Sequence, residues 1–91
     1  MAEVARKVRV TGRVQGVFFR QWTCEEARQL GVKGWVWNHP DGSVQARLEG
    51  EESAVKQLID RMNDGPPSAV VEGVQVNDVG LERFERFEVR H

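Results

Sequence analysis

A short glycine-containing segment that ends in an arginine carries the residues best suited to chemistry in this chain. It runs from Gly12 to Arg20 and contains no acidic residue. Gly16 lets the backbone curl without a Cβ clash, and successive N–H groups in such a curl can converge on an anion. The guanidinium of Arg20 presents a planar fork of donors that matches two phosphate oxygens. The segment therefore suits a phosphate-binding loop.

Spacing alone slightly favours an ordinary strand-to-helix loop with a surface arginine. Two observations favour the anion site instead. The loop has no carboxylate that would repel an anion, and the glycine is followed by three apolar residues, Val17, Phe18 and Phe19, which anchor the loop. We expect both phenylalanines to lie in the core and to take no part in catalysis.

Basic residues are concentrated around this loop. Residues 4–23 carry five of them and no acidic residue, whereas the whole chain has a net charge of −1. A basic segment in an otherwise acidic chain predicts a local anion site rather than a surface for nucleic acid.

The elements that must position the loop follow from hydrophobic periodicity. Alternating apolar and polar residues predict half-buried strands, and apolar residues three and four positions apart predict helices. The predicted strands are residues 7–11, 32–38, 43–49, 70–77 and 84–90, and the predicted helices are residues 19–30 and a second one through Val55, Leu58, Ile59 and Met62. The turn at 39–42 makes the second and third strands a hairpin.

This order predicts one α+β domain over residues 1–91. The expected architecture is a ferredoxin-like βαββαβ sandwich, in which two helices cover one face of a four-stranded antiparallel sheet. The segment 84–90 reads as a last, edge-like strand. Such a fold hosts many activities, so function has to be argued from the site.

Two signatures resemble those of the acylphosphatase family. Residues 12–20 match the pattern G-x-V-Q-G-V-x-F-R, and residues 34–50 match G-aromatic-V-x-N-x-x-x-G-x-V followed by five residues and a glycine. Trp37 is a mild departure, because the family usually carries a polar residue there, and we expect its side chain to point away from the chemistry.

The resemblance implies an enzyme that hydrolyses acyl phosphates to a carboxylate and inorganic phosphate, with no metal and no cofactor. It assigns phosphate binding to Arg20 and to the backbone amides of Gln15, Gly16, Val17, Phe18, Phe19 and Arg20. It assigns the orientation of the attacking water to Asn38, whose amide does not titrate and so cannot act as a general base. The expected ligands are a small acyl phosphate and inorganic phosphate or another anion, bound by a monomer with no nucleic-acid partner.

The composition indicates a cytoplasmic protein. One cysteine among 91 residues permits no internal disulfide, which fits a reducing compartment. No apolar run approaches the length of a membrane span, and the first six residues lack the apolar stretch of a secretory signal. We therefore expect no membrane partner.

Other functional assignments are weaker. Cys24 lacks the arginine six residues later that cysteine phosphatases need, since that position is Leu30, and His39 has only His91 as a second histidine. An RNA-binding domain of the same element order would stack bases on aromatic residues of its first and third strands, and residues 7–11 and 43–49 contain none. The second alternative is a non-catalytic module of a larger maturation protein. We expect instead a complete, standalone enzyme.

Overall fold

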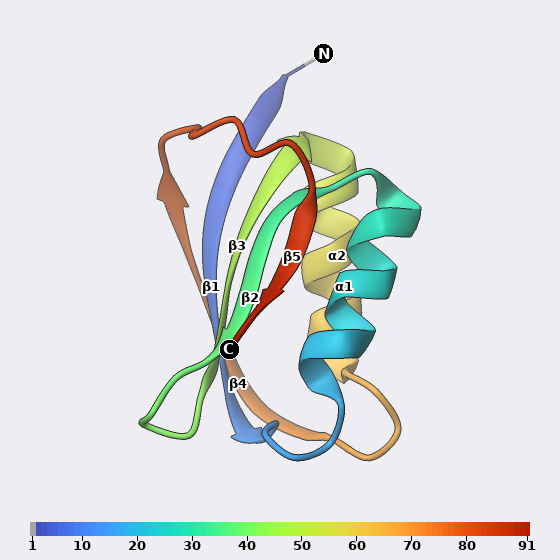
Figure 1. The fold of residues 1–91 in the computed structure, drawn as a ribbon, viewed down its shortest axis with the longest axis vertical. Coiled ribbons are helices and arrows are strands. Elements are labelled where there is room, and N and C mark those ends of the chain that lie inside the picture. Colours follow the sequence, from blue (N-terminus) through green and yellow to red (C-terminus); the bar gives the residue numbers. More distant parts are fainter. Residues whose placement is uncertain (1) are drawn as a thin grey trace.

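The computed structural model describes residues 2–91, which form two helices and five strands (Figure 1). The elements in chain order are β1 (Glu3–Arg13), α1 (Phe19–Leu30), β2 (Lys33–Asn38), β3 (Val44–Glu51), α2 (Glu52–Asp64), β4 (Val70–Val79) and β5 (Phe87–Arg90). The predicted helix 19–30 coincides with α1, and every predicted strand is present with shifted ends. No helix among the described residues is long and apolar enough to cross a membrane.

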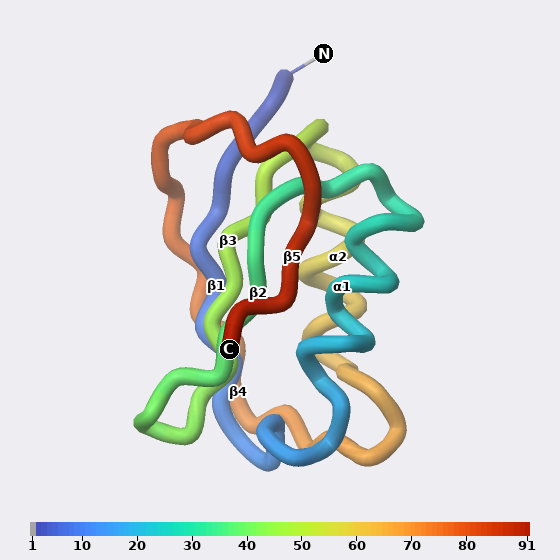
Figure 2. The backbone as a smooth tube through the Cα atoms, in the orientation of Figure 1, coloured from blue at the N-terminus to red at the C-terminus, as the bar shows by residue number. Residues whose placement is uncertain are grey.

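The five strands form one sheet in the order β4-β1-β3-β2-β5. Strand β1 is antiparallel to β3 and β4, and β2 is antiparallel to β3. Both helices cover the same face of this sheet, as Figure 2 also shows. The expected α+β ferredoxin-like fold is therefore confirmed.

The sheet differs from the expected four antiparallel strands because it contains a fifth strand, β5, which pairs in parallel with β2. Burial explains this strand: the side chain of Phe87 is 1% exposed, and the Phe87 carbonyl accepts hydrogen bonds from Cys24 Sγ and Arg28 Nη2 of α1. Packing under α1 thus holds a four-residue segment against β2.

The core lies between the sheet and the two helices. Strands β1, β2 and β3 contribute alternate residues to it, as expected from the twofold period of a strand, and the helices contribute one apolar stripe each. Its members include Val8, Val10, Val36, Val44, Ala46 and Leu48 from the strands, and Phe19, Ala27, Val55, Leu58 and Met62 from the helices.

Strand direction decides where loops can meet. Because β1 and β2 are both antiparallel to β3, they run the same way, and β5 runs parallel to β2. The carboxyl ends of all three strands therefore lie at the same end of the sheet, in the lower half of Figure 1. The 12–18 loop, the 39–43 turn and the last residues of the chain lie at this end of the sheet.

A buried carboxylate fastens the opposite end of the sheet. The connection between β4 and β5 must cross the sheet, because these strands form its two edges. Glu49 of β3 is 3% exposed beneath it and accepts hydrogen bonds from the backbone N–H groups of Glu82 and Arg83 and from Nε of Arg47. Burial raises the pKa of the Glu49 carboxyl, but these hydrogen bonds outweigh that effect and hold its pKa below the ordinary value.

We predict that Glu49→Gln lowers the free energy of unfolding at pH 7 by about 2 kcal/mol, because the neutral amide is a weaker acceptor for these three donors. The native pKa lies below the unfolded one, so the contribution is present above the unfolded pKa and is lost as the pH falls through the native pKa. Urea unfolding of both proteins between pH 7 and pH 3 measures this difference. The exposed Glu72→Gln should stay within about 0.5 kcal/mol of wild type, and an equal loss in both variants would contradict the role of Glu49.

Candidate active site

The loop between β1 and α1 adopts a curled backbone. Gly16 has φ 74°, and Phe18, directly before α1, has φ 62° and ψ 23°. Left-handed residues at alternate positions turn successive N–H groups toward one side, which is the geometry of an anion nest. None of the N–H groups of residues 15–18 donates to another backbone group within residues 2–91. The start of α1 adds the free donors and partial positive charge of a helix N-terminus, with no acidic residue in its first turn.

Packing beneath the loop keeps it curled. Val14, Val17 and Phe19 are buried, whereas the side chain of Phe18 is 82% exposed. The expectation that both phenylalanines lie in the core is therefore correct for Phe19 and wrong for Phe18. The left-handed backbone of Phe18 explains the difference, since it turns this side chain outward while both neighbours point inward.

Gly12 begins the loop at a β-bulge between β1 and β4. A Cβ at this position would lie 2.2 Å from the carbonyl oxygen of Val70 and 2.8 Å from the amide nitrogen of Glu72. No side chain fits there without moving the backbone of β4. The first glycine of the signature is thus required by the close approach of two strands, not by contact with a ligand.

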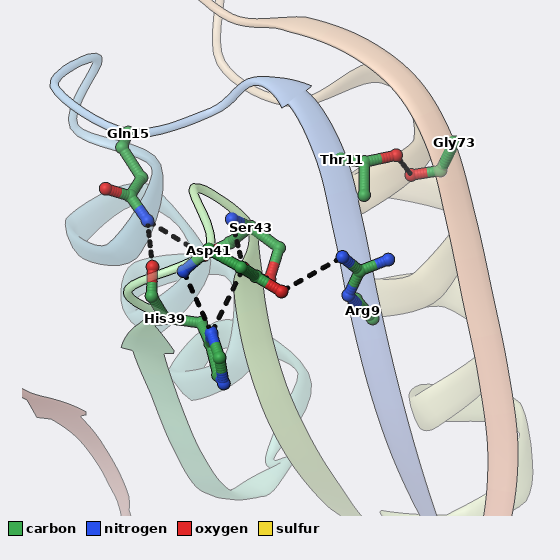
Figure 3. Close-up of polar contacts among 7 residues, drawn as sticks. All are labelled: Arg9, Thr11, Gln15, His39, Asp41, Ser43 and Gly73. Carbon is green, nitrogen blue, oxygen red and sulfur yellow. Dashed lines mark hydrogen bonds and ion pairs between the residues drawn. The ribbon is translucent and has the colours of Figure 1, made fainter.

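A glutamine ties the loop to the turn between β2 and β3 (Figure 3). Nε2 of Gln15 donates to the carbonyl oxygens of His39 and Ser43, at 2.7 Å and 3.0 Å. The two segments are far apart in sequence but lie at the same end of the sheet. Gln15 therefore fixes the distance between the curled loop and the end of β2, where Asn38 lies.

An aspartate holds the shape of that turn. The Asp41 carboxylate accepts hydrogen bonds from the hydroxyl and the backbone N–H of Ser43 and forms an ion pair with Arg9 (Figure 3). The Ser43 hydrogen bonds, followed by that of Arg9, hold the pKa of Asp41 well below its ordinary value. The Asp41 N–H donates to Nδ1 of His39, which places His39 in the turn rather than in the site.

Asn38 faces the helices at the end of β2. It pairs with Val44, which pairs in turn with Val10, so the three residues form one row on the buried face of the sheet. Its side-chain oxygen Oδ1 is buried and has no hydrogen-bond partner within residues 2–91. Buried polar atoms are nearly always paired, so this acceptor is available to a bound molecule. Trp37 points to the opposite face, as expected, and packs against the ring of His39.

Arg20 is fixed by the end of the chain. Its Nη1 donates to the carbonyl oxygen of Arg90 at 3.0 Å and lies 3.2 Å from Nδ1 of His91. Both contacts use the same nitrogen, so Nε and Nη2 remain for a ligand. Sequence patterns could not predict this contact, because two residues 70 positions apart leave no local pattern.

A cavity of about 270 Å³ brings most of the predicted residues together, but Gln15 and Val17 are not part of its lining. Its lining includes Gly16, Phe18, Arg20, Asn38 and His91 and contains no carboxylate side chain. A larger hollow of about 430 Å³ lies at the other end of the sheet, where Glu3, Glu49 and Glu51 would repel an anion. The smaller cavity suits a phosphate because it combines the guanidinium of Arg20 with the curled loop.

The structure places the remaining candidates elsewhere. Cys24 is buried, and its Sγ donates to the Phe87 carbonyl at 3.7 Å, which makes it a structural residue. No group of three or more His, Cys, Asp or Glu side chains in residues 2–91 is arranged to hold a metal ion.

Comparisons with known proteins show the family and the fold of this chain. The acylphosphatase family model matches residues 6–89. An acylphosphatase from Rhizobium etli is 50% identical over 82 residues, which are 90% of this chain and 87% of that protein. The structure of an acylphosphatase from Coxiella burnetii superposes with a TM-score of 0.94 at 36% identity, over 97% of this chain and 93% of that one.

A part of a larger protein is similar as well. Full-length HypF, in a phosphate- and nucleotide-bound form, matches 99% of this chain with a TM-score of 0.92 and 30% identity. The match covers only 12% of that chain. The same fold therefore occurs both in small acylphosphatases and inside a much longer protein.

We predict that Gln15→Ala loosens the loop. Losing two hydrogen bonds should lower the free energy of unfolding by about 1 kcal/mol, because both carbonyls keep a second donor. The affinity for inorganic phosphate should fall several-fold, as the amides lose their fixed spacing. Urea unfolding and calorimetric titration with phosphate measure the two effects.

Gln45→Ala is the matched control, since this glutamine lies on the open face of β3, where it pairs with Trp37 of β2. It should change neither quantity. Phosphate affinity that is the same in Gln15→Ala and in wild type would contradict the positioning role of Gln15.

Proposed function

Because this chain belongs to the acylphosphatase family, we propose that the cavity beside Arg20 and Asn38 hydrolyses small acyl phosphates to a carboxylate and inorganic phosphate. One observation carries the assignment of residues. Within residues 2–91, the amides of residues 15–18 and the Oδ1 atom of Asn38 have no hydrogen-bond partner, and they lie at the same end of the sheet as the guanidinium of Arg20.

The phosphate group binds to the amides of residues 15–20 and to Arg20. The amides supply converging donors, and the helix N-terminus adds partial positive charge. Nη1 of Arg20 is held by Arg90 and His91, so Nε and Nη2 form the fork that receives two phosphate oxygens. The donors are in place before the substrate arrives, so little reorganisation opposes binding.

The water is placed by Asn38. Its Oδ1 accepts a hydrogen bond from the water, which then attacks phosphorus in line with the leaving oxygen. A bond forms between the water oxygen and phosphorus, and the bond between phosphorus and the acyl oxygen breaks. The carboxylate leaves with the electron pair, and a phosphate oxygen takes the water's proton.

Positioning and electrostatics suffice for this reaction. Phosphoryl transfer passes through a loose transition state whose charge spreads over the equatorial oxygens, and the amides and guanidinium face those oxygens. The carboxylate is a good leaving group, so the reaction does not require a strong general acid.

We infer that the protein works as a cytoplasmic monomer on a small molecule. The lone cysteine is buried and unpaired, which supports a reducing compartment. Size-exclusion chromatography with light scattering tests the monomer, and a mass of about 10 kDa is expected from the sequence.

We predict that Arg20→Ala lowers kcat/KM for benzoyl phosphate by about 1,000-fold and removes measurable affinity for inorganic phosphate, because the charge and the fork are lost together. Arg20→Lys should also lose most activity, since a point charge does not reproduce the fork. Arg13→Ala, in the same loop but outside the cavity lining, is the control. Activity of Arg20→Lys within twofold of wild type would show that bidentate binding is not needed.

Asn38→Ala should separate turnover from binding. We predict that kcat for benzoyl phosphate falls about 100-fold, because the water loses its fixed acceptor, while the inhibition constant of inorganic phosphate changes less than threefold. Asn77→Ala, on the exposed part of β4, should change neither value. A normal kcat in Asn38→Ala would rule out the placement of water by Asn38.

A further inference from the structure

Phe18 is the most exposed large apolar side chain in residues 2–91, at 82%. The others in this group are Val70, Val76 and Leu81, which are 37–56% exposed. A single exposed apolar side chain is common on protein surfaces, but this ring lies in the lining of the cavity beside Arg20, where a bound ligand can contact it.

The backbone conformation of Phe18 is itself unfavourable. Phe18 has φ 62°, a conformation that only one other non-glycine residue, Arg83, adopts among those described. Strain of this kind is about 1–3 kcal/mol and is found mainly at functional sites. Glycine or asparagine would supply the same backbone amide with less strain. The amide nest therefore does not explain why the residue carries a large ring.

The position of Phe18 suggests what its ring contacts. It lines the cavity together with Arg20 and Asn38. Of the other apolar residues lining this cavity, Val14 and Phe19 are buried beneath the loop and Val89 is partly buried. When a phosphate is bound to the loop amides, the acyl group has to project from the cavity. The ring of Phe18 is the large apolar surface exposed in the lining of that cavity.

We propose that the side chain of Phe18 binds the acyl group of the substrate and makes the enzyme prefer aromatic and other large apolar acyl phosphates over acetyl phosphate. This inference rests on the proposed function, because it concerns the part of the substrate that the phosphate site does not hold. Contact with one face of the ring removes a few tens of Å² of apolar surface from water, which corresponds to a preference of about tenfold.

The test compares two substrates in Phe18→Asn, because asparagine tolerates the left-handed backbone and leaves the loop amides in place. The kcat/KM for benzoyl phosphate should fall about tenfold, mainly through a higher KM. The kcat/KM for acetyl phosphate and the inhibition constant of inorganic phosphate should stay within twofold of wild type. Phe18→Leu, which keeps an apolar side chain, should give an intermediate value for benzoyl phosphate.

Leu81→Asn is the matched control, because Leu81 is exposed near the opposite end of the sheet and lines a different hollow. It should leave the ratio of the two substrates unchanged. An equal change for benzoyl and acetyl phosphate in Phe18→Asn would overturn the acyl-group contact. Failure of the wild-type protein to hydrolyse either substrate would instead overturn the proposed function, so the two outcomes are distinct.

Discussion

The rest of this structure depends on backbone N–H groups at the junction of β1 and α1 that have no partner in the described part of the chain, residues 2–91. Backbone N–H groups in folded proteins are normally paired with other groups of the chain or with water. Here the left-handed backbone at Gly16 and Phe18 keeps them turned to one side. The buried side chains of Val14, Val17 and Phe19 hold the curl in place. The energy that keeps the donors available comes from the hydrophobic core.

The sheet brings the remaining groups to these donors. Strands β1, β2 and β5 run in one direction and finish at the same end of the sheet. The β1–α1 loop, Asn38 and the end of β5 therefore lie close together although they are far apart in sequence. Gln15 fixes the loop to the turn, and the carbonyl of Arg90 fixes Arg20. Strand β5 therefore acts both as the edge of the sheet and as the support for the arginine. The site is built from backbone groups and side chains, and these hydrogen bonds make it rigid.

Local patterns in the sequence predicted most of the fold and the identity of the candidate site. Alternation fixed the strands of the core, and the two signatures pointed to Arg20 and Asn38. The parallel pairing of β5 was missed, because a four-residue strand is decided by the burial of Phe87 under α1 and not by its own pattern. The exposure of Phe18 was missed because it depends on the sign of one φ angle. The anchor of Arg20 on the chain end, and the burial of Glu49 under the β4–β5 connection, are long-range contacts that no spacing records.

We infer that the amides of residues 15–20 form one anion site together with the side chain of Arg20. The most direct measurement is a titration with inorganic phosphate followed by amide ¹H–¹⁵N NMR spectra of the whole chain. We expect saturable shifts concentrated in the amides of residues 15–20 and in the Nε–H of Arg20, all with one dissociation constant. Shifts that are absent from this loop, or that spread over the rest of the chain without saturating, would contradict this assignment.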